Sequence, residues 1–318
     1  MFTMNLEPIA AQGEGYGQRL AVSPNGRTWA AAESAILNIW DGKTLAYAVD
    51  TAAYAAGDLR FSDDAQYVYA GTEILDLQKR ALLSLPSLGE SLVAGLPPEE
   101  APPASRFAVQ GAAWTPDGRD LVISAQYRPP RLRGSQESYP GPWWRVLLLD
   151  GRTRALKNSL WEANTPEIRA VACSQRAIAA AHQSVMVWER DTFHLIAEGQ
   201  RHKAGVTDLR FSEDGAWLAS ADWQGRIVIW DARTLKRIAD WVAHSDGAFA
   251  IAIYSPGSLV ATGGADAEIK LWAVERRPEL LGSVATEGEV VALAFYPNGE
   301  QLLAADDAGN IVRCTISA

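Results

Sequence analysis

The chain has 318 residues, of which 48% are hydrophobic and 21% are charged, and its formal net charge is −9. This composition is typical of a globular protein with a large apolar core, and it excludes disorder of the whole chain. The negative charge disfavours a nucleic-acid partner, because phosphate groups repel it and the only basic stretch contains Arg128, Arg131 and Arg133.

A short phrase recurs seven times along the chain and predicts a repeat protein. Each copy has an apolar residue, a small polar residue and then a turn rich in Pro, Asp, Asn or Gly. The copies begin at Val22, Phe61, Trp114, Cys173, Phe211, Tyr254 and Phe295. The steps between them are 39, 53, 59, 38, 43 and 41 residues. Four steps fit the length of a four-stranded propeller blade, about 40–45 residues, and the two longer ones indicate insertions.

A second apolar run follows the phrase and ends in an aromatic residue, often with an acid after it. Examples are Trp40-Asp41, Trp188-Glu189, Trp230-Asp231 and Trp272-Ala273. The alternation in residues 227–230 and 269–272 predicts strands. With these features the sequence resembles the WD40-repeat family over essentially its full length. The resemblance implies an all-β, seven-bladed propeller in which residues 1–318 form a single domain.

The two ends of the chain are expected to close the ring. The last repeat stops at Ile311–Cys314, where the third strand of a blade should end, so blade seven lacks its outer strand. Residues Asn5 to Ala10 precede the first repeat, and in WD40 propellers an N-terminal strand completes the last blade. Because closure removes an exposed sheet edge, we expect loss of residues 1–11 to destabilise the whole ring.

The resemblance assigns a structural role to the polar residues His244, Thr262, Asp266 and Trp272 of blade six. They would form a hydrogen-bonded chain from carboxylate to imidazole to hydroxyl to indole. The alternative is a hydroxyl–His–carboxylate catalytic triad. We favour the structural role, because a hydroxyl held in such a buried chain has no room for a substrate carbonyl.

Blade five repeats part of this set with His202, Ser220 and Trp230. Gln224 stands at the position of the aspartate, so we expect the chain in blade five to lack its carboxylate. We predict no catalytic residue in either blade.

No metal site or cofactor is expected. The four histidines have no HxxxH or HxH spacing, and the glycine-rich segment 13–17 lacks the context of a phosphate-binding loop. Cys173 and Cys314 are far apart in sequence and are expected to be buried free thiols. The N-terminus has no signal-peptide pattern and no apolar run reaches about 18 residues, so we expect a cytoplasmic protein without a membrane partner.

Two insertions, at about 86–105 and 127–142, are the most informative irregularities. The first lies between blades two and three, and the second lies between strands b and c of blade three. In an up-and-down blade, the b–c turns and the connections from strand d to the next strand a share one face, here called the insertion face. Both insertions are therefore expected on this face.

Candidate partner-binding residues are aromatic or arginine side chains expected near the insertion face. They are Tyr127, Arg131, Arg133, Tyr139, Trp143, Trp144 and Trp223. These residue types dominate binding hot spots, and Trp223 occupies a b–c turn position that contacts ligands in WD40 relatives. The alternative is that the second insertion folds back and buries its own aromatics, and one of Trp143 and Trp144 is expected in the core.

The sequence thus favours a non-enzymatic protein–protein interaction scaffold that binds a protein or peptide on the insertion face. One alternative is a small-molecule-binding or hydrolase- or lyase-type propeller that uses the axial channel. That function needs acids, histidines or metal ligands on the innermost strands, where segments 170–172 and 250–252 are small and apolar. A further alternative is a fixed subunit of a larger assembly.

Overall fold

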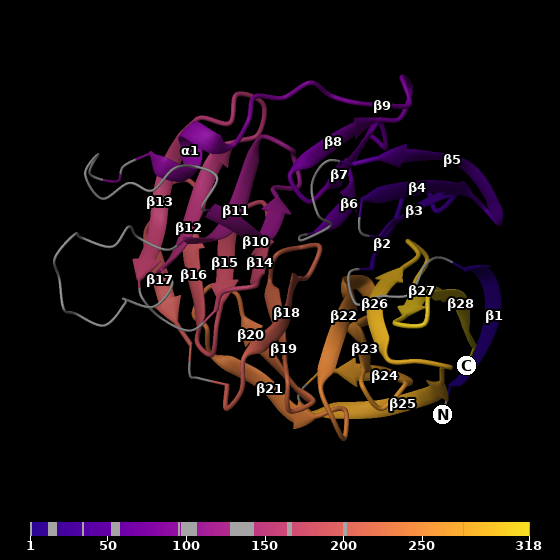
Figure 1. The fold of residues 1–318 in the computed structure, drawn as a ribbon. Coiled ribbons are helices and arrows are strands. Elements are labelled where there is room, and N and C mark those ends of the chain that lie inside the picture. Colours follow the sequence, from indigo (N-terminus) through magenta and orange to yellow (C-terminus); the bar gives the residue numbers. More distant parts are fainter. Residues whose placement is uncertain are drawn as a thin grey trace, which may run out of the picture.

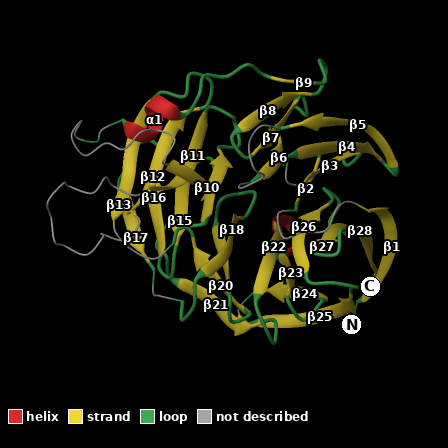
Figure 2. Cartoon of the chain, viewed as in Figure 1, coloured by secondary structure: helices red, strands yellow, loops and turns green. Residues whose placement is uncertain are grey.

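The computed structural model describes residues 2–11, 18–33, 35–51, 58–94, 96, 107–127, 143–163, 167–199, 202–275 and 277–317. In these residues the strands form seven four-stranded antiparallel sheets, arranged as blades around a central axis (Figures 1 and 2). The predicted seven-bladed propeller is therefore confirmed.

The first four blades follow one another along the chain, each with its strands in the order a to d from the axis outward. Blade one contains β2 (Arg19–Val22), β3 (Thr28–Glu33), β4 (Ile36–Asp41) and β5 (Thr44–Asp50). Blade two contains β6 (Leu59–Phe61), β7 (Tyr67–Ala70), β8 (Glu73–Asp76) and β9 (Ala81–Leu82). Blade three contains β10 (Phe107–Trp114), β11 (Asp120–Tyr127), β12 (Trp143–Asp150) and β13 (Leu156–Ala163). Blade four contains β14 (Ala170–Cys173), β15 (Ala177–Ala181), β16 (Val185–Glu189) and β17 (Leu195–Glu198).

The last three blades complete the ring. Blade five contains β18 (Val206–Phe211), β19 (Trp217–Asp222), β20 (Arg226–Asp231) and β21 (Arg237–Val242). Blade six contains β22 (Ala248–Tyr254), β23 (Leu259–Gly264), β24 (Glu268–Val274) and β25 (Pro278–Ala285), with a 3-10 turn at Ser255–Gly257. Blade seven contains β26 (Val290–Phe295), β27 (Gln301–Asp306), β28 (Asn310–Ser317) and the N-terminal strand β1 (Thr3–Ala11).

The ring closes as predicted, because β1 pairs antiparallel with β28. The register places Met4 opposite Ile316 and Leu6 opposite Cys314. The Phe2 backbone N–H also donates to the Leu281 carbonyl oxygen of β25, at 2.8 Å. The two ends of the chain thus build one blade and tie it to its neighbour.

The turns between strands a and b have the backbone that their sequence predicts. Four glycines occupy the left-handed region there, with φ of 70° at Gly26, 65° at Gly118, 68° at Gly215 and 72° at Gly299. In blade two Ala65 takes this place at φ 53°. The preceding Ser62 hydroxyl donates to Asp64 at 2.6 Å, and this bond helps to hold the turn.

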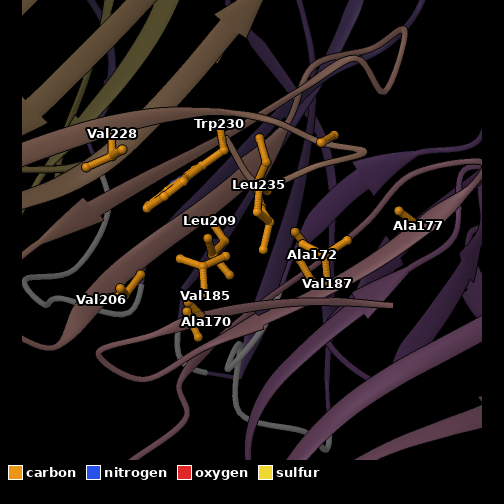
Figure 3. Packing of buried hydrophobic residues seen from close by; sticks show 14 residues of the cluster. Ala170, Ala172, Ala177, Val185, Val187, Val206, Leu209, Val228, Trp230 and Leu235 are labelled. Atoms are coloured by element: carbon orange, nitrogen blue, oxygen red, sulfur yellow. The ribbon is translucent and has the colours of Figure 1, made fainter. Parts of the chain in front are cut away.

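The apolar core lies between adjacent blades. Between blades four and five, small residues of β14 and β15 face larger ones of β18 and β20, including Leu209 and Trp230 (Figure 3). Each inner strand buries one face against the blade before it and the other against the blade after it. This packing explains why the strands are rich in Ala, Val and Ile on both faces.

The described part of the first insertion folds onto blades two and three. It contains the short helix α1 (Gly89–Val93), whose Leu92 is buried beside Trp114 and Tyr69. The buried Arg145 of β12 donates to the carbonyl oxygens of Leu92 at 2.8 Å and Ala94 at 2.9 Å. These bonds satisfy carbonyl groups that the end of a helix leaves without partners.

Candidate functional site

Trp223 is the most prominent exposed side chain of the insertion face. It lies in the turn between β19 and β20 and is 53% exposed. It is the only aromatic residue among the large hydrophobic side chains that are exposed in the described ranges. Its ring packs edge-on against Phe249 of β22, with centroids 5.1 Å apart and an interplanar angle of 70°. The position fits a contact residue, because one edge of the ring is supported and the rest meets solvent.

The turn that presents Trp223 is held by local hydrogen bonds. Asp222 accepts from the backbone N–H groups of Gln224 at 2.8 Å and Arg226 at 3.1 Å. Gly225 has φ 76°, and a Cβ there would lie 2.1 Å from the His244 carbonyl oxygen. Only glycine therefore allows the two segments to come this close.

Two of the predicted partner-binding residues are buried, and this corrects the prediction for them. The Tyr127 ring stacks on Phe107 with centroids 4.8 Å apart, and its hydroxyl donates to Glu162 at 2.6 Å. Trp144 is 1% exposed in the core between blades three and four. The pairing of β11 with β12 places Trp143 opposite Tyr127 and Trp144 opposite Gln126. Both faces of β12 are buried from Trp144 to Leu149, and only its end residues, Trp143 and Asp150, are half-buried.

The remaining candidates, Arg131, Arg133 and Tyr139, lie outside the described residues. Trp223 and Trp143 are thus the predicted partner residues that the described structure leaves open to contact.

The polar chain of blade six has the geometry that the resemblance implies. The His244 Nδ1 atom lies 2.6 Å from Asp266 Oδ1, and Nε2 lies 2.8 Å from the Thr262 hydroxyl. The Trp272 indole N–H donates to the same hydroxyl at 2.9 Å. Lys270 extends the chain, with its ammonium group 2.9 Å from Asp266 Oδ2.

Blade five contains an equivalent chain with a carboxylate that the sequence pattern missed. His202 Nε2 lies 2.8 Å from the Ser220 hydroxyl, which accepts from the Trp230 indole at 2.8 Å. The Nδ1 atom lies 2.8 Å from Asp222 Oδ2. The expectation that Gln224 replaces the acid is therefore wrong, because Asp222, at the end of β19, supplies it two residues earlier.

Both chains hold their hydroxyl groups in buried, hydrogen-bonded positions. The Thr262 and Ser220 side chains are fully buried. Since each hydroxyl oxygen accepts from an indole, its proton is directed to Nε2 and the imidazole donates from Nδ1 to the carboxylate. A hydroxyl engaged on both sides cannot reach a substrate.

Burial lowers the pKa of His244 below its ordinary value, although Asp266 opposes this shift. The unfolded chain therefore binds a proton at this site more readily than the folded chain. Stability from this group is complete above the unfolded pKa of about 6.5 and falls as the pH drops through it. We expect the free energy of unfolding to decrease from pH 7.5 to pH 5.5, and this decrease to be smaller in His244→Gln. Urea denaturation at several pH values in this range measures the free energy of unfolding of both proteins. The same change with pH in both proteins would contradict the prediction.

A set of charged side chains near the axis was not expected from the sequence. It comprises Arg19, Asp58, Arg60, Asp208 and Arg210, from the innermost strands or their first residues. The small apolar segments of blades four and six had given little support to a chemical site at the axis. The sequence does contain one feature that could have indicated these charges, since the same five residues occur at 58–62 and at 208–212.

Other chemical features are few in the described residues. No group of three or more His, Cys, Asp or Glu side chains in the described ranges is placed to hold a metal ion. Cys173 and Cys314 are free, and burial raises the pKa of Cys314 to about 12. Within the part of the chain that the structure describes, no helix is long and apolar enough to cross a membrane.

Comparison with known proteins identifies the class. The family model for the WD domain, G-beta repeat, matches residues 194–231 and 235–273. Each match contains strand d of one blade and strands a to c of the next, and each includes one complete polar chain. The fold is thus a seven-bladed β-propeller, and the two matched segments are WD40 repeats within it.

Solved structures with the same fold include two propellers of very different sequence. One is in the "Crystal Structure of Mitotic Checkpoint Complex", with a TM-score of 0.71, 15% identity, and coverage of 99% of this chain and 91% of that chain. The other, "Structure of U3-55K", has a TM-score of 0.73, 14% identity, and coverage of 98% of both chains. At this identity the likeness concerns the fold alone. No curated protein matches the sequence.

Proposed function

We propose that this propeller is a non-catalytic scaffold that binds a protein or peptide partner on its insertion face, around Trp223. The observation that carries the proposal is the half-exposed Trp223 ring, held on a glycine-fixed turn and supported by Phe249. A rigid aromatic side chain loses little conformational entropy on binding and buries a large area. Two free cysteines agree with a cytoplasmic location, which is part of the proposal.

Features around Trp223 favour a partner with an apolar side chain. Val242, at the end of β21, is another exposed apolar side chain at this end of blade five, opposite Arg226 in the ladder. Exposed charges of both signs flank blade five, with Lys203 before β18 and Asp246 after β21. WD40 propellers commonly serve as interaction scaffolds, and this family tendency agrees with the proposal. Similar propellers also occur in solved structures of complexes, such as the mitotic checkpoint complex.

Trp223→Ala is expected to weaken partner binding at least about tenfold, because it removes the centre of the contact. The loss of one aromatic pair should cost only about 1 kcal/mol of stability. The measurement is quantitative affinity capture from native lysate, with the melting temperature of each protein determined in parallel. Shortening residues 128–141 in a second variant tests the contribution of the second insertion.

Leu195→Ala is the matched control, because Leu195 is 48% exposed at the start of β17, where the c–d turn places it toward the opposite face. Partners lost from Trp223→Ala and retained by Leu195→Ala would support the site. An unchanged set of partners in a folded Trp223→Ala protein would contradict it.

A further inference from the structure

The innermost strands of blades two and five, together with flanking residues, contain the same five residues, Asp-Leu-Arg-Phe-Ser, at 58–62 and 208–212. These blades are not neighbours in the ring (Figure 1). Nevertheless, an Nη atom of Arg210 forms an ion pair with Asp58. Since other blades separate β6 from β18 in both directions around the ring, this contact must cross the propeller axis.

The two copies differ in how their charges are paired. Arg210 contacts Asp58 and also Asp208, whose Oδ1 lies 3.3 Å from its Nε. Asp208 in turn accepts from the Ile251 backbone N–H of blade six at 3.0 Å. Both aspartates are therefore engaged with one arginine, and the arginine of the other copy is left over.

Arg60 is that arginine. Among the residues that the structure describes it has no carboxylate partner, and its Nη1 donates to the Trp114 carbonyl oxygen at a long 3.3 Å. Its Nε atom is buried and has no hydrogen-bond partner. A guanidinium that is partly removed from water without a counter-charge is costly, so its presence indicates a ligand that supplies the charge.

Other charged groups lie near the axis as well. Arg19 of blade one is close enough to Asp58, Asp208 and Arg210 to interact with them electrostatically. In the described residues, two arginines and two aspartates of the repeated segments thus lie on or next to the inner strands of a chain whose net charge is −9. Burial raises the pKa of the nearby Cys173 thiol, despite the Arg60 charge, so this thiol is neutral and adds no negative charge.

Solvent has access to this part of the axis. The Arg210 side chain is 31% exposed and that of Asp58 is 20% exposed, although both belong to the inner wall of the ring. A small solute can therefore reach the charged groups without separation of the blades.

We propose that the propeller axis binds a small oxyanion, of carboxylate or phosphate type, through the guanidinium of Arg60. A guanidinium offers a planar fork of N–H donors that matches two oxygens of either group. Arg210 contributes positive charge, while Asp58 competes with the anion for Arg210. The site is separate from the Trp223 surface, so it can be present whether or not the partner-binding proposal holds.

The experiment is calorimetric titration of the full-length chain with sodium phosphate and, separately, sodium acetate, at constant ionic strength. We expect saturable binding of at least one anion and a loss of affinity of at least about tenfold in Arg60→Met. Arg119→Met is the matched control, because Arg119 is 80% exposed on an a–b turn. Its binding should equal that of the unmodified protein. The preferred anion identifies the ligand as phosphate-like or carboxylate-like.

Asp58→Asn is a second variant that tests the proposal even if Arg60→Met fails to fold. Removal of the competing carboxylate should tighten anion binding, whereas Arg60→Met should weaken it. The proposal is overturned if neither anion binds saturably, or if Arg60→Met binds as well as the unmodified protein. Weaker or unchanged binding by a folded Asp58→Asn protein would also overturn it.

Discussion

Removal of residues 1–11 is expected to lower the melting temperature by more than about 10 °C or to abolish the cooperative transition. Without β1, strand β28 becomes an open edge at the outside of blade seven. The deletion also removes Met4, which is buried in the core of blades six and seven, and the bond from Phe2 to Leu281. Since each blade is buried by its neighbours, damage to blade seven exposes apolar surface on both sides. Scanning calorimetry measures the effect.

A peptide of residues 1–11 provides a specific control for this deletion. If the missing strand is the cause, the added peptide should restore part of the lost melting temperature in a saturable manner. Glu7→Gln in the intact chain should change it little, because Glu7 is exposed and surface ion pairs contribute about 1 kcal/mol or less. A truncated protein that melts like the intact chain would show that the ring does not depend on β1.

His202→Leu is expected to reduce the free energy of unfolding by about 3 kcal/mol or more, and His244→Leu by about 1–2 kcal/mol. The two losses differ because Asp222 and Asp266 keep different partners when the histidine is removed. Asp222 is 0% exposed and, without His202, keeps only backbone N–H partners on its other oxygen. Asp266 is 11% exposed and keeps the Lys270 ammonium group, so its charge remains compensated. Urea denaturation at pH 7.5 measures both losses.

His194→Leu is the control for this pair, since His194 is exposed and outside both chains. We expect it to change stability by less than about 0.5 kcal/mol. Equal losses in His202→Leu and His244→Leu would indicate that the carboxylate environment does not set the cost. A larger loss of stability in His244→Leu than in His202→Leu would contradict the view that Asp222 depends more on its histidine than Asp266 does.

The blades could be predicted from sequence because their signals are local and repeated. The a–b turns need a left-handed residue at one position, and Gly26, Gly118, Gly215 and Gly299 occupy it. Closure by β1 was predictable for a similar reason, since blade seven had three strands and the N-terminus held a spare one. Hydrophobic alternation and turn chemistry act over a few residues, so they can be recognised without the fold.

The polar chain of blade five shows where spacing misleads. In blade six the acid follows the hydroxyl residue by four positions, as in Thr262 and Asp266, and the same spacing in blade five selects Gln224. Asp222 nevertheless reaches His202, because the end of β19 directs its side chain toward the imidazole. The path of the backbone through the turn decides which side chain fits, and residue spacing does not encode this path.

The aromatic candidates show a similar limit. Tyr127 and Trp144 have the composition of a binding surface, yet the pairing of β11 with β12 buries both. Trp144 is buried whereas Trp143 is half-buried, since Trp143 is the first residue of β12 and the strand is buried on both faces after it. The sequence shows that aromatic side chains gather at this point, but packing against the neighbouring blades decides which rings meet solvent.

The seven blades, their turns, the ring closure and the chain of His244, Thr262, Asp266 and Trp272 are thus encoded in short, repeated patterns. The exposure of Trp223, the role of Asp222 and the charges at the axis depend on the tertiary structure. Arg210 and Asp58 are 152 positions apart and meet only because the ring brings opposite blades to a common axis. Contacts of this kind depend on how whole blades are placed, so no local pattern of residues can specify them.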